Sequence, residues 1–263
     1  MSEMVISDVQ GRADVRGFPI ARVGISNVAF YGNIKWSEQP LTASGRCDYY
    51  ASLSRDKKGT HMSRMARSVQ GAIDKQITST LLKDTAVQLL QWLETDRLMI
   101  ELRLECIRPK LSPVTKLAGY EPFNIAFFTT ATTDECATVC EITFTGTSLC
   151  PASKENSEFG AHNQRSIVDI KIPFEDSTNI EEILSVAESC LSSPVYPILK
   201  LEDEKIITEQ AYLNPMFVED IVRNIATTLK QSGISYKQVS CRNLESIHTH
   251  DAYAELFEND STE

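Results

Sequence analysis

The sequence contains no long apolar run. Its 263 residues include no stretch of about 18 consecutive apolar residues, the length that a membrane-spanning helix needs. The first twelve residues contain Glu3 and Asp8 and no apolar segment of the kind found in signal peptides. We therefore expect no membrane span and a cytoplasmic location.

Basic charge is scarce. The chain has 26 Lys and Arg against 36 Asp and Glu, which gives a formal net charge of −10. Nucleic acids and anionic membranes both attract surfaces with a basic footprint. We therefore expect neither as a partner, although a nucleotide substrate needs only a local basic cluster.

The sequence also lacks a CxxC pair, which makes a structural zinc ribbon improbable. The number of cysteines is seven, which is odd, and their spacing is irregular. In a cytosolic chain this indicates reduced thiols, most of them small residues of the core. The seven are Cys47, Cys106, Cys136, Cys140, Cys150, Cys190 and Cys241.

What is present is ordinary for a globular protein, with 42% hydrophobic and 24% charged residues. The length suits one large domain or two modules of about 100–150 residues. Apolar periodicity in the first half predicts two strands, two helices and two further strands. The ranges are 22–34 and 46–54 for the first strands, 65–77 and 82–93 for the helices, and 98–107 and 121–131 for the last strands.

The second half repeats this order of elements without repeating the sequence. Strands are predicted at 137–149, 166–172, 235–241 and 250–256. Thr178, Asn179, Glu181 and Glu182 together indicate a helix N-cap and capping box. Asn214 and Pro215 indicate the start of a second helix. We therefore predict an α+β fold of two modules, each an antiparallel sheet with both helices on one face, covering residues 1–134 and 135–263. The second module ends in an acidic tail.

The polar stretch 146–165 is the most informative for chemistry. A strand should end at Cys150, because Pro151 cannot donate to a ladder. A polar loop with Gly160 as a hinge then leads to His162. A thiol and an imidazole brought together in this way could form a metal site or a Cys–His nucleophile pair. Taken alone, such spacing more often reflects a core cysteine and a loop histidine.

Other candidate residues have ordinary explanations when each is taken alone. His61 and Arg64 lie just before or within the start of a helix, which suits an anion, but Ser63 could simply cap that helix. Glu219 falls on the flank of an apolar helical stripe and could be half-buried, whereas Asp220 points away from the core. The ordinary alternative for Glu219 is a solvated boundary residue. Glu204 would be part of a charged surface turn.

Five segments together resemble one family. They are DVQ at 8–10, GTHMSR at 59–64, TSLCPxSK with GAHNQR at 147–165, DEKxxTExAYxNPxFVED at 203–220 and ESIHxHxAY at 245–253. In this order and spacing they resemble the type IB GTP cyclohydrolases of the tunnelling-fold superfamily. The match extends over nearly the whole chain.

The resemblance implies a fold and a reaction. Each chain would contain two tunnelling-fold (ββααββ) modules and assemble into an oligomeric barrel, a homotetramer with active sites at subunit interfaces. The implied reaction converts GTP and water to 7,8-dihydroneopterin triphosphate and formate. It is the first step of tetrahydrofolate biosynthesis and can also feed queuosine synthesis.

The resemblance also implies site residues. Cys150, His162 and Glu204 look like ligands of a divalent metal, and this mixed donor set is compatible with Zn²⁺, Mn²⁺ or Fe²⁺. The metal would lower the pKa of a water molecule that attacks C8 of guanine. His248 is the candidate acid/base, so the predicted catalytic set is Cys150, His162 and His248.

For the substrate, Glu219 looks like the purine anchor, which would accept a bidentate pair of hydrogen bonds from the guanine N1–H and exocyclic amine. The candidates for the triphosphate are His61, Arg64, Lys154 and Arg165. One departure stands out: the family usually shows CPCSK, whereas Ala152 replaces the second cysteine here. The change could alter metal preference or sensitivity to oxidation.

Three alternatives fit some of the same residues. A nitrile reductase of queuosine synthesis shares the superfamily, but His162 and His248 argue against it. A cysteine hydrolase built on Cys150 and His162 would need no metal. A non-catalytic protein would bind a pterin or nucleotide and release no formate, and such a protein has no need for a hydrolytic set of residues.

Overall fold

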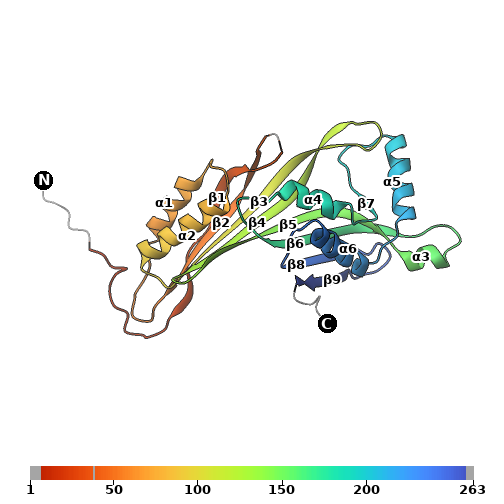
Figure 1. Ribbon diagram of the computed structural model, residues 1–263. Helices are drawn as coiled ribbons and strands as arrows, with labels where there is room; N and C mark the ends of the chain where they lie inside the picture. Colours follow the sequence, from red (N-terminus) through yellow and green to blue (C-terminus); the bar gives the residue numbers. More distant parts are fainter. Residues whose placement is uncertain (1–6, 38, 259–263) are drawn as a thin grey trace.

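A nine-stranded antiparallel sheet forms the centre of the computed structural model, which describes residues 7–37 and 39–258. Its strands follow the order β1-β2-β3-β4-β5-β6-β8-β9, and the short β7 pairs with β5. The strands are β1 (Ile20–Ile34), β2 (Leu41–Leu53), β3 (Arg97–Leu111), β4 (Ala118–Thr132), β5 (Cys136–Leu149), β6 (Asn163–Pro173), β7 (Ser193–Pro194), β8 (Gln238–Asn243) and β9 (Ala252–Phe257). The predicted α+β class is confirmed (Figure 1).

Six helices accompany the sheet in the described part of the chain. They are α1 (Met62–Ala72), α2 (Ser79–Leu93), α3 (Pro151–Asn156), α4 (Ile180–Glu188), α5 (Leu201–Leu213) and α6 (Val218–Gln231). α1 and α2 lie between β2 and β3, and α4 to α6 lie between β6 and β8. None of the helices described is long and apolar enough to cross a membrane.

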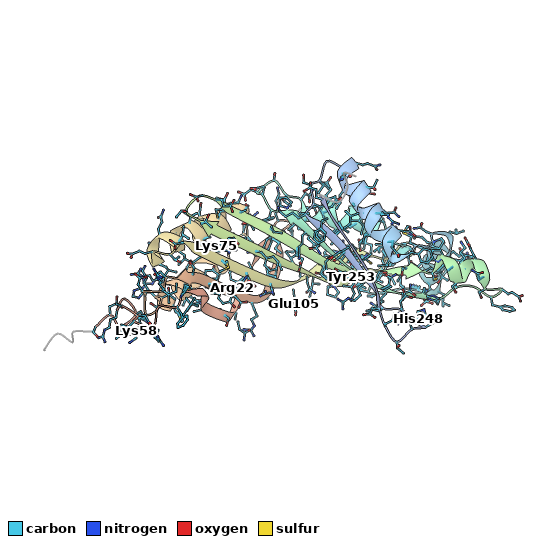
Figure 2. All side chains as sticks on the ribbon, turned by 90° about the horizontal axis from the view of Figure 1, so that it is seen from below. Arg22, Lys58, Lys75, Glu105, His248 and Tyr253 are labelled. Atoms are coloured by element: carbon cyan, nitrogen blue, oxygen red, sulfur yellow. The ribbon has the colours of Figure 1, made fainter. Side chains whose placement is uncertain are left out.

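The core lies on one face of the sheet because apolar residues alternate in register across the strands. Ile125 of β4, Ile142 of β5 and Ile170 of β6 are successive partners across two ladders. Each of the three is at most 1% exposed, and they belong to one continuous apolar cluster that includes residues of both halves. The opposite face carries polar side chains such as Glu105 and Tyr253, which project from the sheet in Figure 2.

The two halves of the chain share this sheet. β4 pairs with β5 over eight residue pairs from Asn124↔Thr143 to Ala131↔Cys136, across the turn that contains the predicted boundary near residue 134. The hydroxyls of Thr129 and Thr138 form a buried hydrogen bond of 2.9 Å between the two strands. The division into residues 1–134 and 135–263 stays a prediction, and residues 259–263 of the acidic tail lie outside the described residues.

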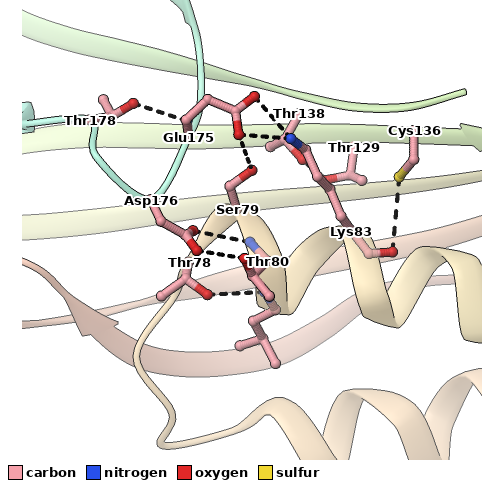
Figure 3. A network of polar contacts seen from close by, with 11 residues as sticks. Thr78, Ser79, Thr80, Lys83, Thr129, Cys136, Thr138, Glu175, Asp176 and Thr178 are labelled. Atoms are coloured by element: carbon pink, nitrogen blue, oxygen red, sulfur yellow. Dashed lines mark hydrogen bonds and ion pairs between the residues drawn. The ribbon is translucent and has the colours of Figure 1, made fainter.

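A polar network also joins the start of α2 to the segment that follows β6 (Figure 3). Asp176 accepts hydrogen bonds from the Thr80 amide at 3.0 Å and from the Thr80 hydroxyl. Glu175 accepts from Ser79 and from the Lys83 ammonium. The Thr78 hydroxyl caps the helix by accepting from the amide of Leu81. The first turn of α2 is therefore held from both halves of the chain.

A second network holds the far end of the β3–β4 hairpin against α4. Arg108 and Lys110 of β3 contact Glu121 of β4 and Glu188 of α4, and all four side chains are at most 11% exposed. The Lys110 ammonium lies 2.8 Å from Glu121 and 2.6 Å from Glu188. We call these four residues the ionic cluster. Its two positive and two negative charges compensate one another in a nearly water-free site.

The prediction for the helix at residue 214 is wrong. Asn214 closes α5, and α6 begins only at Val218, with Phe217 as its N-cap. The backbone between the two helices bonds to β5: the amide of Met216 donates to the carbonyl of Leu149 at 3.0 Å. The predicted N-cap is confirmed, and of its two candidates Asn179 caps α4, since its side chain accepts from the amide of Glu182, whereas Thr178 accepts from the amide of Glu175.

The prediction that the cysteines are reduced and mostly buried is confirmed. All seven are free, and only Cys136 and Cys150 are partly exposed. Burial raises the pKa of the Cys47, Cys106 and Cys241 thiols to about 12, which keeps them neutral and unreactive at physiological pH. Cys150 therefore differs from most of the cysteines in its access to solvent.

Candidate active site

On the helix-covered face of the sheet, the side chains of β5 and β6 change from apolar to polar toward one end of the two strands. Strand alternation places every second residue on the helix-covered face. Along β5 these residues pass from Phe144 to Gly146, Ser148 and, just beyond the strand, Cys150. The partners from β6 and the residue before it are Val168, Ser166, Gln164 and His162. A set of polar side chains therefore lies where the apolar core ends.

Cys150 and His162 lie opposite each other at this end. The Cys150 amide donates to the His162 carbonyl at 3.1 Å, which extends the β5–β6 ladder by one pair. Cys150 is also the N-cap of α3, and its Sγ accepts from the amide of Ser153 at 3.4 Å. Both residues are half-buried. The fold thus brings the predicted thiol and imidazole to adjacent strand ends on one face.

The imidazole of His162 has polar neighbours on one side. Its Nδ1 lies 2.8 Å from Gln164 Oε1, and Gln164 Nε2 donates to Ser148 Oγ at 2.8 Å. Glu245 Oε2 lies 3.9 Å from the same Nδ1. No hydrogen bond to His162 Nε2 is present among the described residues. One ring nitrogen is therefore engaged by the protein and the other is available.

β8 and the loop that follows it complete this end of the sheet. The Ser166 hydroxyl donates to Asn243 Oδ1 at 2.7 Å, and both residues are buried. The loop then exposes His248 and His250, whose rings stack with centroids 5.0 Å apart. Figure 2 shows His248 on this loop, projecting away from the sheet. The predicted acid/base is thus accessible but touches neither Cys150 nor His162.

Two adjacent carboxylates at the start of α5 have opposite environments. Asp203 is fully buried and accepts hydrogen bonds from the amides of Val114, Thr115 and Lys200 and from the Thr115 hydroxyl. Burial opposes its ionisation, but these hydrogen bonds outweigh that cost and hold its pKa well below the ordinary value. Glu204 is exposed. Asp203 therefore fixes α5 to the β3–β4 loop, and Glu204 faces solvent.

One chain does not gather the three predicted metal ligands. Lys154 of α3 donates to the carbonyl of Tyr212 and lies 4.4 Å from the centre of its ring, so α3 contacts the last turn of α5. Glu204 lies eight residues earlier, roughly 12 Å along the helix axis at 1.5 Å per residue. Within residues 7–37 and 39–258, no three His, Cys, Asp or Glu side chains are grouped to hold a metal ion.

For Glu219 the ordinary alternative of a solvated residue is borne out, whereas the prediction that Asp220 points away from the core is wrong. Glu219 is exposed, whereas Asp220 is half-buried and accepts a hydrogen bond from the amide of Phe217 at 2.9 Å. The reason is the later start of α6, which makes Asp220 the third helical residue and allows it to cap the first turn. The Glu219 carboxylate remains open to a ligand.

The predicted phosphate-binding residues fall into two groups. His61 is the N-cap of α1 without a side-chain hydrogen bond, and its Nε2 lies 3.6 Å from Asp8. Arg64 donates to the carbonyl of Trp92. Ser63 does not cap this helix, since it lies inside it. Lys154 and the exposed Arg165 lie beside the β5–β6 site, and Figure 1 places α1 and α3 at opposite ends of the molecule.

Comparison with known proteins decides the family. Residues 6–254 match the model of type I GTP cyclohydrolase FolE2. The chain belongs to the FolE2 family of type I GTP cyclohydrolases. The predicted GTP cyclohydrolase function is thereby confirmed, and the family description gives FolE2 rather than the IB subtype.

Similar FolE2 proteins come from distant organisms. A GTP cyclohydrolase FolE2 of Methylococcus capsulatus is 39% identical over 98% of this chain and 96% of its own length. Those of Thermosipho africanus and Neisseria gonorrhoeae are 35% and 34% identical, over 94% and 95% of this chain and 96% and 97% of their own lengths. The family assignment therefore applies to the whole fold.

Sequence reasoning singled out Cys150 and His162 but missed three neighbours of this FolE2 chain. Gln164, Ser148 and Glu245 surround His162 Nδ1 directly or through one hydrogen bond. The first two carried a readable signal, because a polar residue that occupies a core position of a strand needs a buried partner. Glu245 begins the family motif at 245–253, but its approach to His162 depends on the loop after β8 and carried no local signal.

Proposed function

We propose that this FolE2-family protein converts GTP and water to 7,8-dihydroneopterin triphosphate and formate at the polar end of β5 and β6, in the cytoplasm. The observation that supports this location is the pairing of Cys150 and His162 on one face, at the point where the apolar core ends. Of the seven cysteines, Cys150 is one of two with solvent access.

The donor set fits a divalent cation. A thiolate and an imidazole suit Zn²⁺, Mn²⁺ or Fe²⁺. Cys150 is partly exposed at the N-cap of α3, and His162 Nδ1 is engaged so that Nε2 is free for a ligand. The cation, when bound, supplies a Lewis acid for hydrolysis of the guanine ring. We assign Cys150 and His162 to it as ligands.

Glu204 is the proposed third ligand, and we propose that a second copy of the chain supplies it. Asp203 anchors the start of α5, whereas Glu204 is exposed and lies apart from Cys150 and His162 in one chain. This accords with the proposed assembly of tunnelling-fold modules into a homotetrameric barrel with active sites at subunit interfaces. The two groups of phosphate-binding candidates, which lie at opposite ends of one chain, favour the same arrangement.

The remaining roles follow from access and charge. The exposed Glu219 carboxylate can accept two parallel hydrogen bonds from the N1–H and the amine of guanine. His61, Arg64, Lys154 and Arg165 provide positive charge or donors for the triphosphate. His248 projects on a loop and can carry protons once substrate and a second chain surround it.

The deciding experiment measures GTP turnover by chelator-stripped protein, with Zn²⁺, Mn²⁺, Fe²⁺ or Mg²⁺ added back. Formate and the oxidised, fluorescent pterin are the products to quantify. We expect turnover to return with a transition metal and to fall more than about 100-fold in Cys150→Ala, since loss of a ligand costs more than loss of its supporting hydrogen bond. Cys136→Ala, which removes the other partly exposed cysteine, is the matched control and should remain active.

The same experiment separates the alternatives. Turnover that survives metal removal and still requires Cys150 would indicate a cysteine-nucleophile hydrolase. GTP binding without formate under every metal would indicate a non-catalytic nucleotide-binding protein. NADPH oxidation with a nitrile substrate would indicate the reductase of queuosine synthesis.

A mixing experiment tests the shared site. Cys150→Ala and Glu204→Gln subunits are each expected to be strongly impaired, by at least about 10-fold, and co-expressed subunits with different tags should regain activity in mixed oligomers. About a quarter of the sites would be intact under random assembly, because each needs one subunit of either kind in the correct place. Mixed oligomers without activity would show that Glu204 does not act across a subunit interface.

A further inference from the structure

Gln164 is the residue that contacts the imidazole of His162 most closely. The two residues are separated by one position on β6, so their side chains point to the same face. Gln164 is 7% exposed, and its partner Ser148 on β5 is 0% exposed. Ser148 and Gln164 are also direct partners in the β5–β6 ladder. A buried line of hydrogen bonds therefore runs from Ser148 through Gln164 to His162.

The two ends of an amide are not equivalent, because the oxygen only accepts and the nitrogen only donates. Gln164 Nε2 donates to Ser148 Oγ at 2.8 Å. The structure places Oε1 toward His162, 2.8 Å from Nδ1. Nδ1 must carry the hydrogen of this bond. In a neutral imidazole only one nitrogen is protonated, so the lone pair lies on Nε2.

Glu245 supports the same amide orientation. Its Oε2 lies 3.9 Å from His162 Nδ1, and its side chain is 12% exposed. If the amide of Gln164 were reversed, the Nδ1 lone pair would face a carboxylate, which is repulsive. With the observed orientation, both groups near Nδ1 are acceptors and share its hydrogen. Glu245 thus favours the tautomer that the observed orientation of Gln164 requires.

We propose that Gln164, hydrogen-bonded to Ser148, is a positioning residue that keeps His162 in the Nδ1–H tautomer and presents the Nε2 lone pair to the cation. The part of this proposal that names the cation rests on the proposed function. Partners on the second nitrogen of a metal-binding histidine typically fix its tautomer and ring orientation, and their loss weakens metal binding by about 10–100-fold. Gln164 itself touches neither substrate nor cation.

The test reads the tautomer directly, by imidazole ¹⁵N NMR of chelator-stripped protein at about pH 8, where histidine is mostly neutral. The chain has only four histidines, so the His162 signals are assigned by comparison with His162→Ala. We expect wild type to show Nδ1–H. Gln164→Leu should give a mixture of tautomers and a 10–100-fold weaker Zn²⁺ affinity in a chelator competition. Gln164→Glu keeps an acceptor and should keep both properties.

Ser166→Ala is the matched control. Its hydroxyl is buried at the same end of β6 and donates to Asn243, without contact to His162. It should lose stability but keep the tautomer and the Zn²⁺ affinity. An Nε2–H tautomer in wild type, or an unchanged tautomer in Gln164→Leu, would overturn the proposal. If wild type shows Nδ1–H and Gln164→Leu changes it, but no metal binds to either, the positioning role holds and the proposed metal site fails.

Discussion

Two neighbouring strand pairs become polar where they end, on the same face and at the same end of the sheet, and they differ in which polar groups remain without a partner. At the end of the β3–β4 hairpin, the ionic cluster pairs two cations with two carboxylates, so every charge has a partner inside the protein. At the end of β5 and β6, His162 Nδ1 is engaged but no described residue bonds its Nε2, and the Cys150 thiol is accessible. The first strand-pair end is structural. The second leaves His162 Nε2 without a partner in the described residues and the Cys150 thiol open to solvent.

The comparison shows that polarity inside a fold does not by itself indicate a functional site. Both ends satisfy their buried polar atoms, since none is left without a hydrogen bond in the described residues. A candidate functional site differs from a structural one in having polar groups that are held in place by neighbours but have no partner of their own in the same chain. The predictions below test this distinction.

The largest effect is expected from breaking the ionic cluster. Glu188→Ala leaves Arg108 and Lys110 with excess buried positive charge, which should lower the free energy of unfolding by about 3–5 kcal/mol. Urea denaturation measures this loss. Metal affinity per folded molecule should stay at the wild-type value. A variant that is stable but has lost metal binding would contradict the structural role of this end.

The next effect contrasts the two adjacent carboxylates of α5. Glu204→Gln should lower GTP turnover about 10–100-fold and leave the melting temperature unchanged, because Glu204 is exposed and a candidate ligand. Asp203→Asn should lower the melting temperature, because its four hydrogen-bond donors lose a charged acceptor. Thermal unfolding and turnover are measured on both variants. If Glu204→Gln lowered the melting temperature and Asp203→Asn lowered only turnover, Glu204 would be the structural residue and Asp203 the candidate ligand.

The hydrogen bonds of Asp203 that hold α5 against the β3–β4 loop should contribute to stability in a pH-dependent way. Its pKa is lower in the folded protein than the ordinary value of about 3.9 in the unfolded chain. Its contribution to stability is therefore complete above about pH 4 and is lost as pH falls through the folded pKa. The difference in melting temperature between wild type and Asp203→Asn should be constant from about pH 7 to pH 5 and narrow below about pH 4.

A smaller effect is expected at the contact between the two halves. Thr78→Ala removes the side-chain cap of α2 and should cost about 1 kcal/mol in unfolding free energy. Thr78→Ser retains an accepting oxygen and is the control. Turnover below the melting temperature should be unchanged in both, because this network lies away from the β5–β6 end. Equal stability of the two variants would show that the cap contributes nothing.

The smallest effect is expected at Ala152, which is exposed on α3. Ala152→Cys restores the cysteine usual in this motif and should change turnover less than twofold under reducing conditions, because Cys150 and His162 already face each other without it. The variant should lose activity faster in peroxide, since an accessible second thiol can trap an oxidised Cys150. Timed inactivation with and without reductant compares it with wild type.

Much of the fold could be predicted from local patterns. The long strands alternate in burial over most of their length, so residues such as Ile125 and Ile142 indicated both the strands and the face that the helices cover. The cap at Asn179 was readable for the same reason, because its determinants lie within four residues. The start of α6 was not readable, since it depends on the long-range bond between Met216 and Leu149.

The site could be predicted only in part. Cys150 and His162 were found because a strand end and a returning loop bring them together locally. The separation of Glu204 from them in one chain depends on how Asp203 anchors α5, a contact between residues 88 and 89 positions apart. The support of His162 by Gln164 and Glu245 depends on side-chain orientation, which periodicity does not specify.

The order of strands has a consequence for how the chain folds. From β1 to β6, each strand pairs with the strand that precedes it in the sequence. During synthesis, every one of these new strands therefore meets an edge that has already been made, and only the connection from β2 to β3, which contains α1 and α2, is long. The hairpin of β4 and β5 lets the second half grow directly on the first. The paired ends that carry Cys150 and His162 form as soon as β6 is added, before α5 and Glu204 exist.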